Sequence, residues 1–317
     1  MLINLIPFGE FWIDCAFNAN FSILTSLDKS YRNAALLNSY TYAIVEAGTS
    51  FDNLINYVKL EPAYDQLYLT QSIISIQPVN LKDSNNLLDS LKFVLKENYF
   101  FLGVDLYNWI PNSLCWQKYH WEHYSLIKGY DEEKDVFIVF DSDMSGYCEH
   151  EIPSARLEKA ALDCSFEISG YVISFNPEPG EYNLEKQSVI ENAERLITEI
   201  EDSFARLWKF SDYDIQEAYM FDLMAVFTNE ISERQIANKK LIEELINLNL
   251  IGDTSLIRDF NELKLGWEKI KNLFNRGNLT RKLDCANLDA LKNDLFTKEM
   301  DIWERLVAIL SKRKKPR

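Results

Sequence analysis

Glycine is scarce in this chain, at 10 of 317 residues, and neither a GxGxxG nor a GxxxxGK[ST] pattern occurs. Loops that wrap nucleotide phosphates depend on glycine, so a glycine-lined nucleotide site is excluded. Basic residues are also few, because 33 Lys and Arg stand against 49 Asp and Glu, a formal net charge of −16. Binding nucleic acid requires basic surface to neutralise phosphates. The composition therefore argues against a nucleic-acid partner and favours a cationic one.

Long apolar runs and paired cysteines are missing as well. No stretch of 18 apolar residues occurs, and the N-terminal segment has neither a basic start nor a small-residue cleavage site. The five cysteines are widely spaced, with no CxxC pair. A disulfide scaffold or a zinc ribbon would have a different spacing. We therefore expect a cytoplasmic protein with reduced thiols and no membrane span.

The chain has enough apolar material for a folded core and enough length for two domains. Apolar residues make up 47% and aromatic residues 13% of the sequence. Two prolines and a glycine cluster in residues 176–180. Proline fixes its own φ and disfavours helix in the residue before it, so this segment reads as a linker. We predict one domain over residues 1–176 and a second over 181–317.

Hydrophobic periodicity predicts an α+β fold before the linker and an all-α bundle after it. Asp14 is the expected N-cap of the first helix. The expected N-terminal elements are helices over 15–27, 87–95 and 153–162, and strands over 73–79, 99–106, 123–130, 136–141 and 166–175. The expected bundle helices cover 184–207, 212–228, 231–250, 255–275 and 286–311, with Gly252 and Gly277 as C-caps.

Three side chains in the α+β half have the right types for nucleophilic catalysis. Cys15 opens a predicted helix, whose dipole favours a thiolate, although the neighbouring Asp14 opposes ionisation. His123 begins one strand of a predicted hairpin and Asp141 ends the other, so both lie at the same end of the sheet. A strand-end imidazole can then contact a sulfur with one nitrogen and a carboxylate with the other. These residues form a candidate Cys–His–Asp triad.

Metal and cofactor motifs are weak in comparison. His120 and His123 have an HxxH spacing, but no further ligand follows at a zinc-site interval. Asp141-Ser-Asp143 lacks the glycine and the terminal glutamate of a calcium loop. We therefore expect neither a metal nor a cofactor.

The order of an early helix-opening Cys, a strand-opening His and a strand-ending Asp resembles papain-fold enzymes of the C39-like type. It is more closely similar to the N-terminal domain of the butirosin-biosynthesis acyltransferase family. That resemblance covers about residues 10–176, and an all-helical companion domain is also typical of the family. The stretches that carry it are 101–111, 119–131 and 137–141, followed by a helix ending at 157–161.

The resemblance implies a papain-like fold with Cys15 as nucleophile, His123 as base and Asp141 as the group that orients the base. It also implies substrate-binding roles for Asp105, Tyr107 and Trp12. One departure concerns the oxyanion hole, because residues 7–14 contain no Gln or Asn. The backbone N–H of Cys15 can supply one donor. The second is unassigned, with Asn4, Asn18 and Trp12 as candidates.

The same resemblance implies an acyltransferase that forms amides. Such an enzyme takes an acyl group from an acyl or peptidyl carrier-protein thioester, holds it on cysteine and passes it to an amine. The setting is natural-product biosynthesis of the nonribosomal-peptide or aminoglycoside-antibiotic type. The charge of −16 favours a cationic amine acceptor but disfavours an acidic carrier protein. Shelter of the acyl-enzyme from water would come from an aromatic set near the triad: Trp12, Trp109, Trp116 and Trp121.

Two alternatives remain open on the residues alone. The first is a C39-like cysteine peptidase or amidase, to which the triad is equally suited. The second is a non-catalytic binding protein in which Cys15 belongs to the core and the helical domain contacts partners. The sequence leaves the acyl group, the amine and the oligomeric state undetermined.

Overall fold

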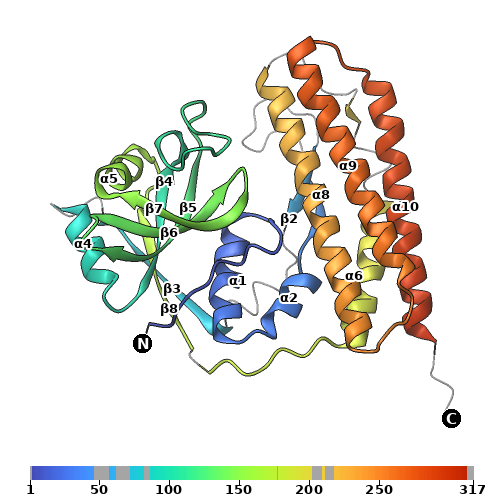
Figure 1. The fold of residues 1–317 in the computed structure, drawn as a ribbon, viewed down its shortest axis with the longest axis horizontal. Helices are drawn as coiled ribbons and strands as arrows, with labels where there is room; N and C mark the ends of the chain where they lie inside the picture. The colour runs from blue at the N-terminus through green and yellow to red at the C-terminus, as the bar shows by residue number, and fades with distance from the viewer. Residues whose placement is uncertain are drawn as a thin grey trace. The chain divides into compact units, whose positions relative to one another are not determined.

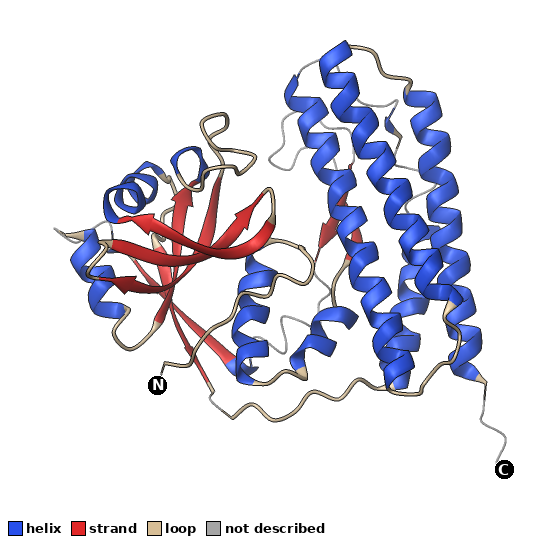
Figure 2. Cartoon of the chain, viewed as in Figure 1, coloured by secondary structure: helices blue, strands red, loops and turns tan. Residues whose placement is uncertain are grey.

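The computed structural model describes residues 2–45, 57–61, 72–81, 86–176, 178–201, 209–210 and 218–312. The chain divides into two compact units (Figures 1 and 2), the first combining residues 1–32 with 65–182 and the second 33–64 with 183–317. The sequence analysis expects a single division at 176–181, and one boundary lies close by, between Tyr182 and Asn183. Segment 33–64, expected in the N-terminal domain, belongs instead to the second unit.

The first unit is built on a six-stranded sheet in the order β3-β8-β4-β5-β6-β7, with every neighbouring pair antiparallel. The strands are β3 (Ile74–Val79), β4 (Tyr99–Asp105), β5 (Glu122–Asp131), β6 (Val136–Asp143), β7 (Gly146–Pro153) and β8 (Gly170–Phe175). The expected strands are confirmed to within a few residues, but β7 was not expected. Its sequence interleaves charged residues with few apolar ones, as suits a strand at the edge of the sheet.

Three helices pack on this sheet. Helices α4 (Leu87–Val94) and α5 (Ser154–Asp163) cover one face, and α1 (Cys15–Leu27) contacts β5 and β6 (Figure 1). Every residue of β4 is buried, as expected for a continuous apolar strand in the middle of a sheet. The core between the sheet and the two covering helices includes Leu91, Phe100, Leu102, Phe137, Val139, Leu157 and Ala160.

The second unit consists mainly of long helices. In its described parts, α9 (Ser255–Thr280) contacts both α8 (Ala218–Asn247) and α10 (Cys285–Ser311), and α6 (Lys186–Glu199) packs on α10. Segment 33–64 adds most of the short helix α2 (Tyr31–Leu37) and the antiparallel pair of β1 (Thr41–Val45) and β2 (Tyr57–Glu61). Neither strand was expected from the sequence.

Two details of the bundle differ from the prediction. The expected break between residues 228 and 231 is wrong, because a single 30-residue helix, α8, runs through it. The two glycine C-caps are also wrong: Gly277 lies inside α9, and the left-handed residues near the helix ends are Asn249 and Arg281, each at φ 55°. Asn enters this conformation at small cost, but Arg does so only under tertiary constraint.

A buried carboxylate fastens segment 33–64 to the bundle. Glu299 of α10 has no exposed surface and accepts hydrogen bonds from the hydroxyls of Tyr40 at 2.7 Å and Tyr42 at 3.1 Å. Gln235 of α8 donates to it at 3.2 Å and Trp303 at 3.4 Å. Burial raises the pKa of Glu299, and the hydrogen bonds only partly offset that effect.

The α+β class is therefore confirmed for the first unit, and the helical character for the second. Among the helices that the structure describes, none is both long and apolar enough to cross a bilayer.

Candidate active site

Cys15 is the first residue of α1, and the chain around it explains why the helix begins there. Asp14 has extended backbone, and its side chain accepts a hydrogen bond from the amide of Phe17 at 2.6 Å. This confirms the expected N-cap. The amides of Cys15 and Ala16 belong to the first turn, which has no intrahelical acceptors, so they face outward at the positive end of the helix dipole.

The segment before Cys15 is held against α1 by two buried polar side chains. Asn18 accepts a hydrogen bond from the amide of Ile13 at 3.0 Å and donates to the carbonyls of Phe8 at 2.7 Å and Phe11 at 2.8 Å. Ser22 accepts one from the amide of Phe8 at 2.8 Å. Both amide hydrogens of Asn18 are therefore in use, which removes it as a candidate oxyanion donor.

The β5–β6 hairpin supplies the other expected catalytic side chains. His123 lies near the start of β5 and Asp141 near the end of β6. Leu126 pairs with Phe140, and extending that register by one residue sets Ser125 opposite Asp141. Residues two apart on a strand share a face, so His123 and Ser125 both point toward this carboxylate.

The structure brings the three residues together. Cys15 Sγ lies 3.3 Å from Oδ1 of Asp141, and His123 Nε2 lies 2.9 Å from Oδ2 of the same carboxylate. One ligating atom from each residue lies within 4.8 Å of the others. Asp141 is 1% exposed, whereas the side chain of His123 is 20% exposed and Cys15 is half-buried. The carboxylate is thus buried beneath a sulfur and an imidazole that solvent can reach.

Further donors fix Asp141, and the sequence analysis missed their role. The backbone amide of Ser142 donates to Oδ1 at 2.7 Å, while the indole of Trp109 donates to Oδ2 at 2.8 Å and the hydroxyl of Ser125 to the same oxygen. Trp109 was expected to shelter an acyl group from water. It is instead fully buried, and its indole donates to Asp141. The sequence signal for the contact from Ser125 was the spacing of His123 and Ser125: residues two apart on one strand face the same way, so both side chains can contact Asp141.

The electrostatics of the His123–Asp141 pair favour an ion pair. Burial alone would raise the pKa of Asp141, but the charge of His123 and hydrogen bonds from His123, Ser125 and Ser142 lower it to about 2. Burial would likewise lower the pKa of His123, yet the Asp141 carboxylate and the Cys15 sulfur hold it well above its ordinary range. At neutral pH the carboxylate is charged and faces an imidazolium.

Cys15 titrates as part of the same group. The pKa of its thiol is raised overall. Burial and the nearby Asp141 carboxylate raise it, and the charge and hydrogen bonding of His123, together with a hydrogen bond from Ser142, offset only part of that increase. The Ser142 hydroxyl lies 3.6 Å from the sulfur. Removing one proton leaves either a thiolate beside an imidazolium or a thiol beside an imidazole, and these forms differ only in where a single proton sits.

The same three residue types can also ligate a transition metal. Here, however, Asp141 accepts hydrogen bonds on both oxygens from Cys15, Ser142, His123, Ser125 and Trp109. If Cys15 and His123 bound a metal they would no longer donate to Asp141, but Ser142, Ser125 and Trp109 would still occupy three of its about four lone-pair positions, which leaves at most one for a cation. The arrangement suits proton transfer better than metal binding.

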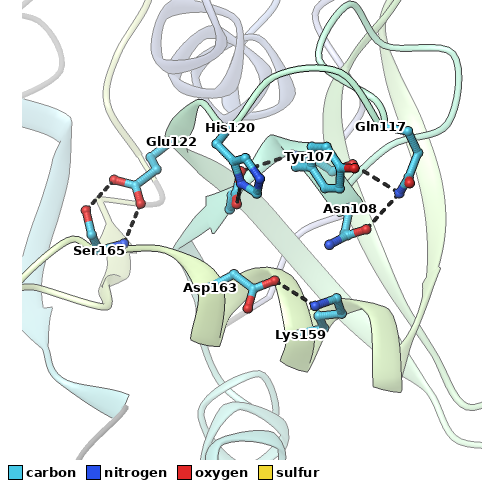
Figure 3. A network of polar contacts seen from close by, with 9 residues as sticks. Tyr107, Asn108, Gln117, His120, Glu122, Lys159, Asp163 and Ser165 are labelled. Carbon is cyan, nitrogen blue, oxygen red and sulfur yellow. Dashed lines mark hydrogen bonds and ion pairs between the residues drawn. The ribbon is translucent and has the colours of Figure 1, made fainter.

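Asp105 and Tyr107, two of the expected substrate-binding residues, form a separate cluster with His120 (Figure 3). Oδ2 of Asp105 lies 2.6 Å from Nδ1 of His120, and the rings of Tyr107 and His120 stack with centroids 4.3 Å apart. Asp105 also caps the 3-10 helix η2 (Leu106–Asn108) by accepting from the amide of Tyr107. The cluster lies next to the triad on the sheet: Asp105 of β4 pairs with Glu122 of β5, and the adjacent residue Val104 pairs with His123.

A cavity of about 840 Å³ opens beside the end of β6. Its lining combines apolar side chains with a cation and an acid: Asn112, Ser113, Leu114, Trp116, Lys118, Asp143, Met144 and Ser145. None of the expected substrate residues Asp105, Tyr107 or Trp12 lines it; Trp12 lies half-buried in the segment before Cys15. Asn4 is exposed near the N-terminus, and no contact links it to the triad among the described residues.

Comparison with known proteins adds no family assignment. A scan against protein-family models found no match, and a search of curated proteins found none either.

Proposed function

We propose that this chain is a cysteine-dependent acyltransferase, with Cys15 as nucleophile, His123 as proton carrier and Asp141 as the group that orients His123. One observation carries the proposal: a half-buried sulfur at a helix N-terminus, an imidazole and a buried, fully hydrogen-bonded carboxylate meet at one point. The proposal includes a papain-like class for the first unit. A nucleophile-bearing helix packed on an antiparallel sheet that carries the base supports that class.

The chemistry balances without an oxidant or a further reactant. From the singly deprotonated triad, Cys15 Sγ attacks the carbonyl carbon of a thioester while its proton resides on His123. The tetrahedral intermediate expels the donor thiol, which takes that proton. An amine then attacks the acyl group on Cys15, His123 accepts the amine proton, and breaking the carbon–sulfur bond returns the proton to the sulfur.

The available oxyanion donors favour a thioester over an amide as the substrate. The amides of Cys15 and Ala16 can donate to the oxyanion, while the side chain of Asn18 is already committed. Exchange of one thioester for another is nearly balanced in free energy, so it requires less stabilisation than cleavage of an amide. This is why transfer, rather than peptide hydrolysis, is the function we propose.

The proposed acceptor follows from charge, whereas the proposed carrier-protein donor rests on the family resemblance and runs against the net charge. The net charge of −16 attracts a cationic amine and increases its encounter rate. The donor is an acyl or peptidyl carrier-protein thioester whose acyl group occupies the cavity beside β6. Leu114, Trp116 and Met144 supply its apolar lining.

Intact-protein mass spectrometry tests the proposal directly. Incubation with a simple acyl thioester, such as an acyl-pantetheine, is expected to add one acyl mass to the wild type and none to Cys15→Ala. Cys285→Ala is the matched control, because Cys285 is also a half-buried cysteine that begins a helix, in the second unit. It should acylate like the wild type.

The fate of the acyl group separates the alternatives. Addition of a diamine should discharge the adduct as amide, at a rate that rises with amine concentration. Release of free acid at a rate independent of amine contradicts the transferase and favours the hydrolase. An adduct that persists in Cys15→Ala, or an absent adduct in a folded wild type, removes Cys15 as the nucleophile and leaves the non-catalytic reading.

A further inference from the structure

A second cluster of ligating side chains lies at the β6–β7 hairpin, outside the triad. Cys148 and His150 are two residues apart on β7, so they share a face, and Cys148 Sγ lies 3.4 Å from His150 Nε2. Asp143 lies at the end of β6, on the other side of the hairpin turn. One ligating atom from each of these residues lies within 4.8 Å of the others, and all are half-buried.

The spacing of these atoms suits a tetrahedral metal ion. With metal–sulfur and metal–nitrogen bonds of about 2.3 and 2.0 Å, two ligands of a tetrahedral site lie about 3.5 Å apart. The Cys148–His150 separation of 3.4 Å therefore needs almost no rearrangement to chelate an ion. A set of one thiolate, one imidazole and one carboxylate selects a borderline transition metal over calcium or magnesium.

The surroundings of Asp143 also differ from those of Asp141. The amide and hydroxyl of Ser145 both donate to Oδ1 of Asp143, at 2.7 and 2.5 Å. The backbone of Gly146 also donates to this carboxylate, whereas both oxygens of Asp141 accept from a larger set of donors. Hydrogen bonds of this kind orient a ligating carboxylate. Asp143 and Ser145 also line the cavity beside β6, which gives an ion a route from solvent.

We propose that Asp143, Cys148 and His150 bind one divalent transition-metal ion of the Zn²⁺ class. Water takes the fourth position, and the Cys148 thiol releases its proton to solvent when the metal–sulfur bond forms. The ion closes the tip of the hairpin. Because Cys148 pairs directly with Asp141 across β6 and β7, the ion also fixes the strand that carries the catalytic carboxylate. The sequence analysis missed this site because the ligand spacing matches no zinc motif.

Cobalt titration of the full-length apo protein is the test, because Co²⁺ bound to a thiolate gives a near-ultraviolet charge-transfer band. One equivalent of Co²⁺ should produce that band, and one equivalent of Zn²⁺ should remove it. Cys148→Ser should abolish the band, and His150→Gln should weaken Co²⁺ binding at least 100-fold. Ser145→Ala, which removes hydrogen bonds to the ligands Asp143 and Cys148 but no ligand itself, should weaken Co²⁺ binding about 10-fold. Circular dichroism confirms that each variant is folded.

Cys15→Ala is the decisive control, since the triad also contains Cys, His and Asp. The proposal requires that this variant keep the full band and that Zn²⁺ raise its melting temperature as it does for the wild type. Cys148→Ser should show no such rise. A band lost in Cys15→Ala but kept in Cys148→Ser overturns the proposal, as does the absence of stoichiometric binding in a folded wild type. None of these measurements depends on the proposed acyltransferase activity.

Discussion

Two buried carboxylates, Asp141 in the first unit and Glu299 in the second, show how similar surroundings give opposite chemistry. Both are at most 1% exposed, and both accept hydrogen bonds from an indole and from hydroxyl groups. The pKa of Asp141 is lowered to about 2, whereas burial raises that of Glu299. The difference is the partner: Asp141 faces His123, while the hydrogen bonds to Glu299 come from neutral side chains.

The comparison shows that hydrogen bonds alone do not keep a buried acid charged. Neutral donors offset part of the desolvation penalty, but a cationic partner reverses its effect on the pKa. Asp141 therefore stays ionised and controls the proton of His123. Glu299 instead joins Tyr40 and Tyr42 to the bundle, which is a structural task.

The largest expected difference between substitutions of the two acids is in the rate of Cys15 acylation. Asp141→Asn should lower the rate of Cys15 acylation by about 10³-fold or more, because the imidazole loses the charge that orients and stabilises its protonated form. Glu299→Gln is the matched neutral substitution and should leave the rate within about threefold. Single-turnover acylation followed by mass spectrometry measures both. Equal losses in two folded variants would show that Asp141 acts only through stability.

The two acids should also give opposite dependences of local stability on pH. The lowered pKa of Asp141 stabilises the folded state at pH values above 3.8, which is the pKa of this carboxyl in the unfolded chain. That contribution, about 2 kcal/mol, is lost as pH falls through about 2. The raised pKa of Glu299 stabilises the folded state at pH values below 4.5, which is the pKa of this carboxyl in the unfolded chain. That contribution is lost as pH rises through the pKa in the folded state.

Hydrogen exchange of peptides from β6 and α10, corrected for intrinsic rates, measures these contributions. Between about pH 2 and 4, the stabilisation of β6 in the wild type relative to Asp141→Asn should grow as pH rises, whereas the stabilisation of α10 in the wild type relative to Glu299→Gln should fall as pH rises above 4.5. Slopes of the same sign would contradict the assignment of a charged Asp141 and a Glu299 that favours its protonated form.

The smallest expected effects come from deleting one hydroxyl donor beside each acid. Ser125→Ala and Tyr42→Phe should each cost about 1 kcal/mol of stability or somewhat more, since each removes one hydroxyl with little change in shape. The Ser125 hydroxyl contacts Asp141, Trp109 and His123, and the Tyr42 hydroxyl contacts both oxygens of Glu299. Only Ser125→Ala should also slow Cys15 acylation, by about 10-fold. Thermal unfolding and single-turnover acylation measure the two effects. An equal slowing in Tyr42→Phe would contradict the proposed division between Asp141 as a catalytic acid and Glu299 as a structural one.

Much of the fold could be predicted because local signals and tertiary packing agree. Helix α1 begins and ends at the expected residues, and Asp14 caps it as expected. Strand β7 was missed because its charged residues break the apolar pattern, although it pairs with β6 across a tight turn, and the pair β1–β2 was missed as well. Membership of segment 33–64 in the second unit depends on long-range contacts such as Tyr40 with Glu299, which periodicity does not encode.

Part of the candidate site could likewise be predicted from the sequence, and part could not. His123 and Asp141 could be brought together because strand start and strand end are local features that a hairpin converts into proximity, whereas Cys15 joined them only through the family resemblance. Trp109 and Ser142 reach Asp141 from a loop and from a backbone amide, which a residue pattern does not reveal. Asp105 and Tyr107 were expected at the substrate site but contact His120, because Asp105 caps the turn after β4.

The most direct test of the account is the pH profile of Cys15 alkylation, followed by mass spectrometry of the modified peptide. His123 lowers the pKa of the Cys15 thiol by its charge and by hydrogen bonding. His123→Gln should therefore raise the apparent pKa for alkylation. His120→Gln, which alters the exposed imidazole beside Asp105, should leave that pKa unchanged. Identical profiles for Cys15 in the wild type and in His123→Gln would contradict the claim that these side chains share a proton.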